Sequence, residues 1–541
     1  MSYASENRRV LMLILIYLAV TFATINLGYI DFGDGNYLYI SGRMADGVRL
    51  YEEIVSPQPP VHLFIGKVLV QTARWISGFL PGAVREGFAV YFIRIYLAVL
   101  HAATIVVLWR IARRIFEESA IRVLAILLYV LLPNTYLWTR GFQSECHEIL
   151  FLYLSFLFLL RGGRAGMLLA AGLSLVGIFT NMTFAPYLLL FLVYCLVVRP
   201  NRWVLFVLPT AALVPVFLIA MQKWSHGTYI QNVFLNQFGT YPPLFPSGTD
   251  KALGIPPLIG YAWGKLLSEG GDLLRVEGAT IVLGFLGMFL LTGAQSERPN
   301  RGFILWFSLF AFGSVIFVTK GGTMEYIFTL GEPMVALLGA YFLYTVVVGV
   351  DLDIRPERWR IERGIYVGKL IAILFAAIVF LYQPLTHVAR TLFTQDTYEA
   401  PVAQTLGVRD LILEYAPNQE DLILAPAYYA FLSDRVLVGE CSSSCMWSMR
   451  YQNARRKTDR GPDVGLNAQI SLMVSQLNSG KVKIVLLRTD QLGAISEIRK
   501  AVEDSFEPLI VDHPVHGRNW RVEIQTSNEH LEVYVPKQRA G

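Results

Sequence analysis

The chain has 541 residues, of which 54% are hydrophobic and only 16% are charged. Because a soluble domain carries about a quarter charged residues, this composition excludes an ordinary soluble protein and indicates a membrane protein. The net charge of +5 is small for this length and gives no case for nucleic acid as a partner, and four cysteines fit neither a disulfide scaffold nor a zinc site.

Apolar segments recur along the first 386 residues, and a membrane-spanning helix needs about 20 mostly apolar residues. By this criterion we expect about eleven transmembrane helices, at residues 10–30, 88–111, 118–138, 147–162, 165–181, 183–199, 203–222, 274–294, 303–319, 327–348 and 365–386. The first run is longer than the core of a signal peptide and lacks a small-residue cleavage site, which predicts a retained helix. We therefore expect an α-helical polytopic membrane part, residues 1–386, followed by a C-terminal soluble α/β domain, residues 387–541.

Lysine and arginine near the ends of the spans predict the orientation. With eleven spans, all the basic turns fall on one side, the cytoplasm: Arg8 and Arg9, 109–114, 161–164, 199–202, 297–301 and 354–363. We therefore expect a multi-pass protein of the plasma (inner) membrane whose N-terminus is cytoplasmic. The other, extracytoplasmic side receives the first loop 31–87, the turn 139–146, the second large loop 223–273, the segment 319–326 and the C-terminal domain.

Two segments outside the spans carry particular expectations. Residues 61–82 are apolar, but Lys67 and Arg74 interrupt them, and a span here would reverse the charge pattern downstream. An interfacial helix fits better. In the second large loop, the stretches YPPLFPSG and GIPP favour turns over a continuous helix.

From about residue 387 the composition becomes that of a soluble domain. The segments DLILA (421–425) and KIVLLRT (483–489) predict buried strands. Helical patterns recur near 400–416, 464–478 and 491–504. The segments WRVEIQT and HLEVYVP alternate in polarity and predict a closing antiparallel pair.

The cysteines fall into two groups. Cys441 and Cys445 are separated by three serines and would lie in an oxidising compartment, where they either form a local disulfide or remain two thiols. Cys146 and Cys195 are expected to fill apolar space.

Residues 31–60 of the first loop hold five acidic residues. Asp31 and Asp34 lie where the chain leaves the bilayer, and a charge at that depth is costly without a partner or a task. A carboxylate beside an apolar phase can serve as a base, so both are candidate catalytic residues. Asp46, Glu52 and Glu53 are more simply interpreted as solvated loop residues.

A second group of polar residues lies in the turn TRGFQSECHE, which offers Arg140, Glu145, His147 and Glu148. Glu145 and Glu148 are three residues apart, so a helix starting there places both near one face, where they are further candidate catalytic carboxylates. Capping of the helix is the structural alternative, because acids favour a helix N-terminus. His147 is a candidate substrate-binding residue.

Three cations and two tyrosines complete the candidate substrate-binding residues. Arg94 lies inside the second span, which predicts a buried partner or an anionic ligand. Arg140 and Lys320 could each hold a phosphate or simply anchor the chain at the membrane interface. Tyr326 lies at the start of the tenth span and Tyr37 in the first loop. No metal ligands are predicted.

The sequence contains no nucleotide-binding motif, neither a Walker-type loop nor a glycine fingerprint after a strand. An enzyme that works outside the cytoplasm has no supply of nucleotide sugars. An activated lipid would be a suitable substrate for such an enzyme.

Several motifs occur together in the membrane part. They are DFGDGNYLYISGRMADG (31–47), LYEE (50–53), QPP (58–60), Arg94, the acid-bearing turn at 145–148 and KGGTMEYIFTLGEP (320–333). In this combination the chain resembles the GT-C superfamily of membrane glycosyltransferases, with the closest likeness to bacterial relatives of protein O-mannosyltransferases and aminoarabinose transferases. The likeness covers about residues 10–350.

The resemblance implies transfer of a sugar from a polyprenyl-phosphate donor to a lipid, glycan or protein acceptor, on the outer face and with inversion at the anomeric carbon. Asp34 best matches the family's first-loop aspartate, the base that deprotonates the acceptor, and Asp31 is the second candidate. Two departures matter. Many relatives have Asp-Glu where this chain has Asp34-Gly35, and a lysine often stands where Gln58 precedes the prolines, so another cation would bind the phosphate. No cofactor is assigned, and a divalent metal stays an open alternative.

Two other functions compete with this one. The first is a lipid or sugar transporter or flippase, whose charges inside the membrane would line a path; transporters often have internal repeats, and none is visible here. The second is a non-catalytic assembly subunit with the same fold, which the missing Asp-Glu pair keeps open.

Overall fold

The structure is a computed structural model. It describes residues 3–25, 35–81, 88–132, 135, 141–199, 201–235, 255–293, 301–315, 325–347, 371, 374, 378, 402–442, 445–446, 449, 464–488, 492–513, 517–521, 523–525 and 530–537. The predicted site residues Asp31, Asp34, Arg140 and Lys320 lie outside these residues.

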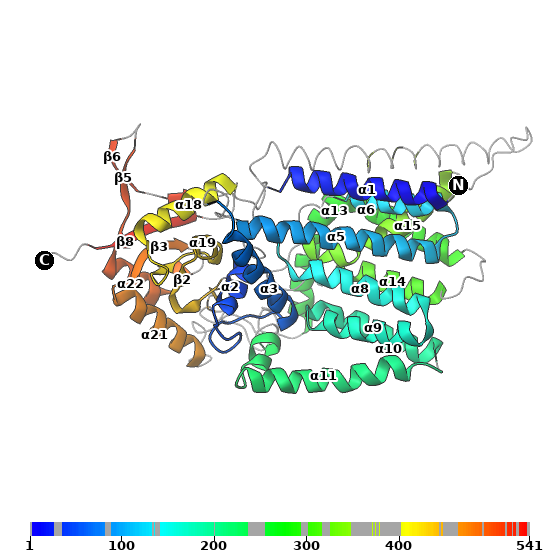
Figure 1. The fold of residues 1–541 in the computed structure, drawn as a ribbon, viewed down its shortest axis with the longest axis horizontal. Coiled ribbons are helices and arrows are strands. Elements are labelled where there is room, and N and C mark those ends of the chain that lie inside the picture. Colours follow the sequence, from blue (N-terminus) through cyan, green and yellow to red (C-terminus); the bar gives the residue numbers. More distant parts are fainter. Residues whose placement is uncertain are drawn as a thin grey trace, which may run out of the picture.

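A bundle of long helices forms the N-terminal part of the molecule, and most of them run along its long axis (Figure 1). The helices are α1 (Tyr3–Ala23), α5 (Phe88–Ile115), α6 (Ser119–Val130), α8 (Ser144–Arg161), α9 (Gly163–Ile178), α10 (Ala185–Val198), α11 (Val204–Trp224), α13 (Ile255–Gly293), α14 (Arg301–Gly313) and α15 (Glu332–Val347). Each coincides with one of the spans expected from the sequence. The remaining expected span, 365–386, lies outside the described residues except for three isolated positions.

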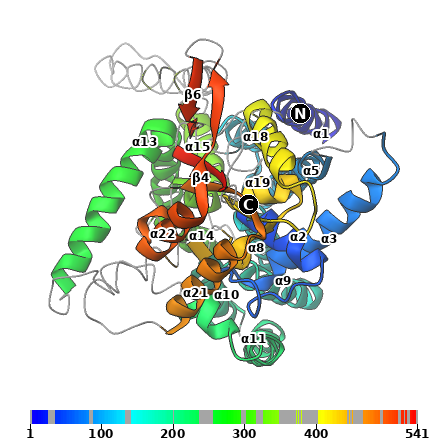
Figure 2. The same ribbon diagram turned by 90° about the vertical axis from the view of Figure 1, so that its left-hand side faces the viewer.

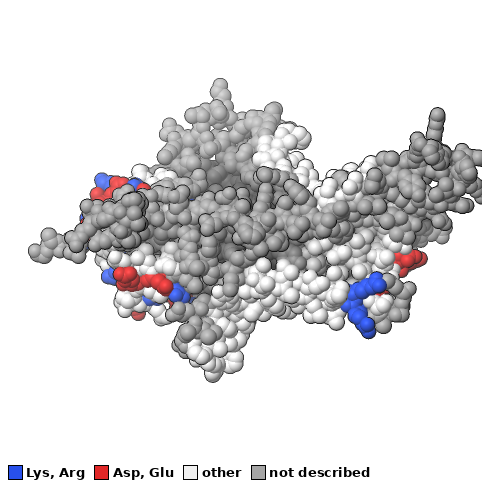
Figure 3. Space-filling view, turned by 90° about the horizontal axis from the view of Figure 1, so that it is seen from above, with Lys and Arg blue, Asp and Glu red and all other residues white. Residues whose placement is uncertain are grey.

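The outer faces of the bundle are apolar. Leu11 and Leu15 of α1, Val197 of α10 and Val216 of α11 are all exposed. On the face shown in Figure 3, the charged side chains of the described residues gather toward the two ends of the molecule, with an uncharged stretch between them. A soluble protein rarely exposes such large apolar areas, whereas lipid would cover them.

Length and composition support two membrane spans within the described residues, α5 and α11. Shorter apolar helices accompany them, among them α6, α9 and α14. The number of eleven spans therefore stays a prediction.

Two shorter helices, α2 (Leu38–Ala45) and α3 (Pro60–Ser77), cross the end of the bundle instead of running along it (Figure 1). Pro60 is the first residue of α3, where a missing N–H costs no hydrogen bond. The helix expected at 61–82 is therefore present. Near its C-terminus Trp75 is 68% exposed and Phe79 is 74% exposed, as suits a helix at a membrane surface.

The expectation that prolines keep the second large loop free of continuous helix is wrong for its last part. Helix α13 begins at Ile255, well before the expected span at 274, and in Figure 2 it is inclined to the rest of the bundle. Pro256 and Pro257 fall in its first turn, where the backbone N–H groups have no partner within the helix and proline is tolerated. The stretch YPPLFPSG lies outside the described residues.

A mixed sheet follows in the C-terminal part, at the opposite end of the bundle from the start of α1 (Figure 1). Its strands are β1 (Leu422–Leu424), β2 (Val436–Leu437), β3 (Val482–Arg488), β4 (Phe506–Pro508), β7 (Glu523–Gln525) and β8 (His530–Pro536), in the order β2-β1-β3-β8-β4 with β7 also paired to β8. The pairs of β1 with β2 and β3 are parallel, and those of β8 are antiparallel. Strands β5 (Ile510–His513) and β6 (Gly517–Arg521) form a separate hairpin.

The secondary structure expected from the sequence in this part is confirmed. Strands β1 and β3 are the two buried strands, and β7 pairs with β8 as the closing antiparallel pair. The helices are α18 (Val402–Tyr415), α19 (Ala427–Ser433), α21 (Val464–Asn478) and α22 (Ser496–Ser505). Cys441 and Cys445 form the local disulfide, and Cys146 and Cys195 are buried and not disulfide-bonded.

The sheet and the crossing helices share one hydrophobic core. Leu38 and Ile40 of α2 and Leu63 of α3 belong to the same buried cluster as Tyr429 of α19 and Ile484 of β3. A second large cluster lies within the helical bundle. The crossing helices therefore lie between the bundle and the sheet and contact both.

Candidate active site

Polar side chains are buried where α2 and α3 meet the first turn of α8. After Asp34, the described residues begin at Gly35, and Asn36 and Tyr37 are both buried. The Tyr37 hydroxyl accepts a hydrogen bond from Nε2 of Gln58 at 2.9 Å. Gln58, which stands where relatives often have lysine, thus contacts the segment that precedes α2.

Glu145 lies in the first turn of α8 and Glu148 follows one turn later, and both face the segment before α10, as their spacing predicts. The Glu145 carboxylate accepts hydrogen bonds from Nδ2 of Asn181 at 3.0 Å and from the Ser144 hydroxyl at 3.2 Å. The Glu148 carboxylate accepts one from the Thr183 hydroxyl at 2.7 Å. Because Glu148 is fully buried, loss of a hydrogen-bond donor to its carboxylate would lower the free energy of unfolding.

The segment at 181–183 is held in place by its own local structure. Asn181 caps the short helix Met182–Phe184, since its side-chain oxygen accepts a hydrogen bond from the Thr183 backbone N–H. Just before it, the Phe179 carbonyl accepts a hydrogen bond from the Val61 N–H, one of the first N–H groups of α3. The start of α3 is thus hydrogen-bonded to the segment that supplies the donors to the two carboxylates.

Two histidines join α3 to α8. Nδ1 of His62 lies 3.3 Å from Nδ1 of His147, and Nε2 of His147 lies 3.0 Å from the Tyr96 hydroxyl of α5. The His62 ring stacks on Phe142 and meets Tyr37 edge to face. Burial, with His147 beside it, holds the pKa of His62 well below its ordinary value, so this ring is neutral near pH 7.

Nε2 of His62 is buried and has no hydrogen-bond partner within the part of the chain that the structure describes. A buried polar atom of this kind costs free energy unless another group satisfies it. The first-loop residues Asp31 and Asp34 precede Tyr37, which contacts the same ring.

An open apolar pocket of about 510 Å³ adjoins the histidine pair. The first three turns of α3, from Pro60 to Leu69, form one wall, and Phe217 and Met221 of α11 form another. Tyr96 lines the pocket as well, so the hydroxyl that contacts His147 belongs to a residue at its edge. The site therefore combines buried carboxylates and imidazoles with an adjacent apolar surface.

The remaining predicted residues lie apart or are only partly described. Arg94 is buried on α5, and its Nη1 donates to the Ile25 carbonyl, just after α1, at 2.5 Å. Tyr326 lies in the short 3₁₀ helix Glu325–Leu330, which is joined to α8 by a hydrogen bond from the Tyr153 hydroxyl to the Leu330 carbonyl.

Sequence reasoning missed His62, Tyr96, Asn181 and Thr183. The one local signal was for His62, a histidine two residues after the double proline in an otherwise apolar helix. Within the described residues, no group of three or more His, Cys, Asp or Glu side chains could hold a metal ion. Asp31 and Asp34 are outside those residues, so a divalent metal stays an untested alternative.

No family sequence model and no curated protein sequence matches the chain. Solved structures do match. The chain superimposes on ArnT from Cupriavidus metallidurans, solved with bound undecaprenyl phosphate, with a TM-score of 0.57 over 98% of this chain and 99% of that chain, at 13% sequence identity. The fold is that of the GT-C glycosyltransferases.

A second GT-C structure supports this identification of the fold. The oligosaccharyltransferase of Archaeoglobus fulgidus, solved with a tethered acceptor peptide, matches with a TM-score of 0.51 and 11% identity over 98% of this chain and 76% of that chain. The same enzyme in complex with an inhibitory peptide and a dolichol phosphate matches with a TM-score of 0.51 and 12% identity over 99% of this chain and 77% of that chain. The GT-C fold expected from the sequence motifs is therefore confirmed, and the superpositions cover nearly the whole chain.

Proposed function

We propose that the protein is a membrane glycosyltransferase that transfers a sugar from a polyprenyl-phosphate donor to a lipid, glycan or protein acceptor. The observation that carries this proposal is the match of nearly the whole chain to GT-C enzymes, one of them solved with undecaprenyl phosphate and another with a dolichol phosphate. The buried polar cluster beside an apolar pocket supports it independently.

The apolar pocket suits the isoprenoid part of such a donor. Its walls come from α3 and α11 and expose almost no polar surface, so burial of a hydrocarbon chain there is favourable by about 25 cal/mol for each Å² removed from water. Tyr96 and His147 stand where the pocket meets the polar cluster. A lipid lying in the pocket would bring its phosphate and sugar toward this cluster.

The proposed reaction needs one base and one anion site. Asp34, or Asp31 in its place, takes the proton of the acceptor hydroxyl, and the acceptor oxygen forms a bond with the anomeric carbon. The bond from that carbon to the phosphate oxygen breaks on the opposite side, so the configuration inverts and polyprenyl phosphate leaves with its electron pair. Arg140 and Lys320 are the cations proposed to hold the phosphate.

The carboxylates of α8 have a defined place in this scheme. Glu145 and Glu148 already accept hydrogen bonds from Asn181 and Thr183, which fixes their orientation beside the histidine pair. They are proposed as the second pair of catalytic carboxylates after the aspartates. Tyr37, which contacts Gln58 and His62, is proposed to contact the substrate together with His147 and Tyr326.

The test is transfer by the purified full-length protein from a panel of radiolabelled undecaprenyl-phosphate sugars, with cell-envelope fractions as acceptors. We expect the Asp34→Asn variant to lose about 10²–10⁴-fold in turnover, because general-base catalysis contributes that much. Asp31→Asn should lose less, and Asp504→Asn, an exposed aspartate on α22, should retain full turnover.

Two results would overturn the proposal. Near-normal turnover by folded Asp34→Asn and Asp31→Asn variants would remove the aspartate base. The same donors in proteoliposomes separate the other functions, since label that crosses the membrane without transfer indicates a flippase, and label that is neither moved nor transferred indicates a non-catalytic subunit.

A further inference from the structure

An ion pair joins the C-terminal sheet to α2, the helix that directly follows the first-loop aspartates. The Glu440 carboxylate accepts hydrogen bonds from Arg43 at 2.6 Å through Nη2 and at 3.0 Å through Nε. The Tyr39 hydroxyl donates to the same carboxylate at 2.8 Å and accepts from the Leu437 N–H at 2.9 Å. Glu440 therefore binds two residues on one turn of α2.

This contact is sheltered from solvent. The side chains of Arg43 and Glu440 are each only 20% exposed. Burial alone lowers the pKa of Arg43, but the hydrogen bonds and charge of Glu440 outweigh this effect and raise it. A charged pair with two parallel hydrogen bonds is stronger and more specific than a single surface contact.

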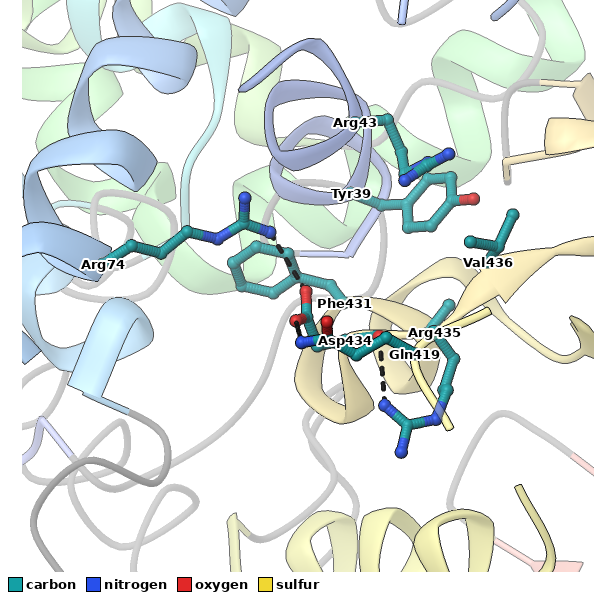
Figure 4. Close-up of a pocket in the computed structure, with 9 residues that line it drawn as sticks. Tyr39, Arg43, Arg74, Gln419, Phe431, Asp434, Arg435 and Val436 are labelled. Atoms are coloured by element: carbon teal, nitrogen blue, oxygen red, sulfur yellow. Dashed lines mark hydrogen bonds and ion pairs between the residues drawn. The ribbon is translucent and has the colours of Figure 1, made fainter. Parts of the chain in front are cut away.

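A second, more exposed set of contacts lies beside the first, and Figure 4 shows Arg43, Arg74 and Asp434 of this set around a small pocket between α2 and α19. Arg74 of α3 contacts Asp434 at 3.0 Å and Asp46 at 2.6 Å, and Asp46 also contacts Arg43. Screening by water and salt weakens exposed pairs of this kind. The Glu440 contact is therefore the stronger link between the sheet and α2.

The turn that presents Glu440 has an unusual backbone. Gly439 and Glu440 both have positive φ, 65° and 49°, although glutamate rarely adopts that region. A Cβ atom at residue 439 would lie 2.9 Å from Nε2 of Gln469, which donates to the Gly439 carbonyl. A side chain at residue 439 would displace the Gln469 amide, and the positive φ would strain any residue other than glycine.

A disulfide closes the chain directly after this turn. Cys441 follows Glu440 and is bonded to Cys445, so the carboxylate is held between the glycine and a covalent link. The four cysteines of the chain provide this one disulfide, because Cys146 and Cys195 are not disulfide-bonded. Reduction of the disulfide would remove this covalent constraint from the C-terminal side of the turn.

The opposite face of α2 belongs to the candidate site. The Ser41 hydroxyl donates to the Leu63 carbonyl of α3, and Tyr37 at the start of the helix contacts Gln58 and His62. Leu38, the first residue of α2, is four residues after Asp34. A shift of α2 would therefore move Tyr37 and Ser41 relative to α3.

We propose that Glu440, in a turn closed by the Cys441–Cys445 disulfide, is a positioning residue that holds α2 in place beside α3, so that reduction of the disulfide loosens the candidate site. The catalytic part of this inference rests on the proposed glycosyltransferase function, whereas the holding of α2 does not.

Amide hydrogen exchange of the full-length protein tests the holding of α2. In Glu440→Gln, we expect the amides of residues 38–45 to exchange at least about tenfold faster, while those of β3 stay as protected as in the unmodified protein. Glu503→Gln, which removes a carboxylate paired with Arg499 on the same part of the chain, is the matched control and should leave α2 unchanged. Unchanged exchange of α2 in a folded Glu440→Gln variant would overturn the proposal.

Reductant tests the role of the disulfide. It should speed exchange of α2 in the unmodified protein and have no further effect on the Cys441→Ser, Cys445→Ser double variant. Complete reduction, verified by thiol labelling, without any change at α2 would refute the role of the disulfide. Preserved exchange rates in Gly439→Ala would refute the role assigned to the turn.

Activity provides the separate catalytic readout. If the glycosyltransferase function is correct, kcat of Glu440→Gln should fall by roughly 10–100-fold, because small displacements of reacting groups cost that much, with little change in the KM of the donor. An Arg43→Glu, Glu440→Arg double variant should recover part of kcat. Loss of α2 protection in a protein without any transferase activity would refute the proposed function and leave the positioning of α2 established.

Discussion

His62 shows how burial sets the chemistry of a single residue in the candidate site. Its ring is 0% exposed, contacts His147, Phe142 and Tyr37, and is held neutral by burial. In the unfolded chain the same ring takes up a proton below a pH of about 6.5. The folded state therefore binds fewer protons than the unfolded state in acid, and the free energy of unfolding must depend on pH there.

We predict that the protein loses stability as the pH falls below about 6.5 and retains it fully above that value, because the depressed pKa of His62 disfavours the protonated folded state. The contribution of one such group reaches about 1.4 kcal/mol for each pH unit. The apparent melting temperature in detergent, measured between pH 5 and 7.5, should fall less steeply for His62→Gln. His226→Gln is the control, since His226 is 66% exposed, and it should keep the original slope. Identical slopes for all three proteins would contradict this assignment.

The Glu148 carboxylate is stabilised by a hydrogen bond from one hydroxyl, that of Thr183. We predict that Thr183→Val lowers the free energy of unfolding by about 1–3 kcal/mol, because it leaves a fully buried carboxylate without the donor at 2.7 Å. Thermal unfolding measures this loss. Thr72→Val, which removes a hydroxyl on the outer side of α3 that donates only to the backbone, should change stability little. An equal loss in both variants would show that the Glu148 contact is not special.

These residues also show which parts of the site the sequence could predict. The shared face of Glu145 and Glu148 follows from the period of a helix and is confirmed. Their donors Asn181 and Thr183 lie more than 30 positions away, and His62 lies 85 positions from His147, so no local pattern connects them. Tertiary packing alone brings them together.

At the scale of secondary-structure elements, the candidate site depends on the close approach of α2 and α3. Gly66 of α3 faces Ser41 of α2 and the ring of Phe142, and a Cβ atom at residue 66 would lie 2.7 Å from Cε1 of Phe142. The stack of Phe142 on His62 leaves that ring little room to move. Glycine at this position thus allows the two helices and the ring to pack in one place.

We predict that Gly66→Ala destabilises the α2–α3 contact and raises the exchange rate of the α2 amides, because the added methyl group displaces Ser41 or Phe142. Overpacking of this kind costs about 1–3 kcal/mol. Gly172→Ala on α9 is the matched control, since nothing lies within 4 Å of the added Cβ, and it should be neutral or slightly stabilising. Equal stability of the two variants would show that α3 can shift without cost.

The elements themselves were largely predictable, and the exceptions have a physical cause. Apolar runs long enough for a span became helices, and the alternation in HLEVYVP became β8. The start of α13 was missed because proline was treated as a helix breaker, although Pro256 and Pro257 lie in the first turn, where proline is tolerated. The packing of the sheet against α2 had no signal in the sequence, because Arg43 and Glu440 are almost 400 positions apart.

At the scale of the whole molecule, the charged side chains of the described residues lie toward the two ends of the face in Figure 3, with an uncharged stretch between them. One end holds the start of α1, where Glu6 pairs with Arg122 and accepts a hydrogen bond from Trp109. The other end holds the crossing helices and the sheet (Figure 1). If the bundle crosses a membrane, as its exposed apolar faces suggest, the candidate site and the sheet share one side and the start of α1 lies on the other.

We predict that the sheet is extracytoplasmic and that the basic turns are cytoplasmic, because arginine-rich turns are retained in the cytoplasm. A reporter that is active only outside the cytoplasm should be active when fused after Gly541 and inactive when fused after Gly162, between α8 and α9. A reporter that is active only in the cytoplasm should give the reverse pattern at both points. The disulfide at Cys441 and Cys445 supplies an independent check, since it should form in the membrane-inserted protein and resist a reductant confined to the cytoplasm. Cytoplasmic activity after Gly541 would place the sheet and the candidate site on the side where nucleotide sugars are available, and the argument for a lipid-linked donor would lose its topological support.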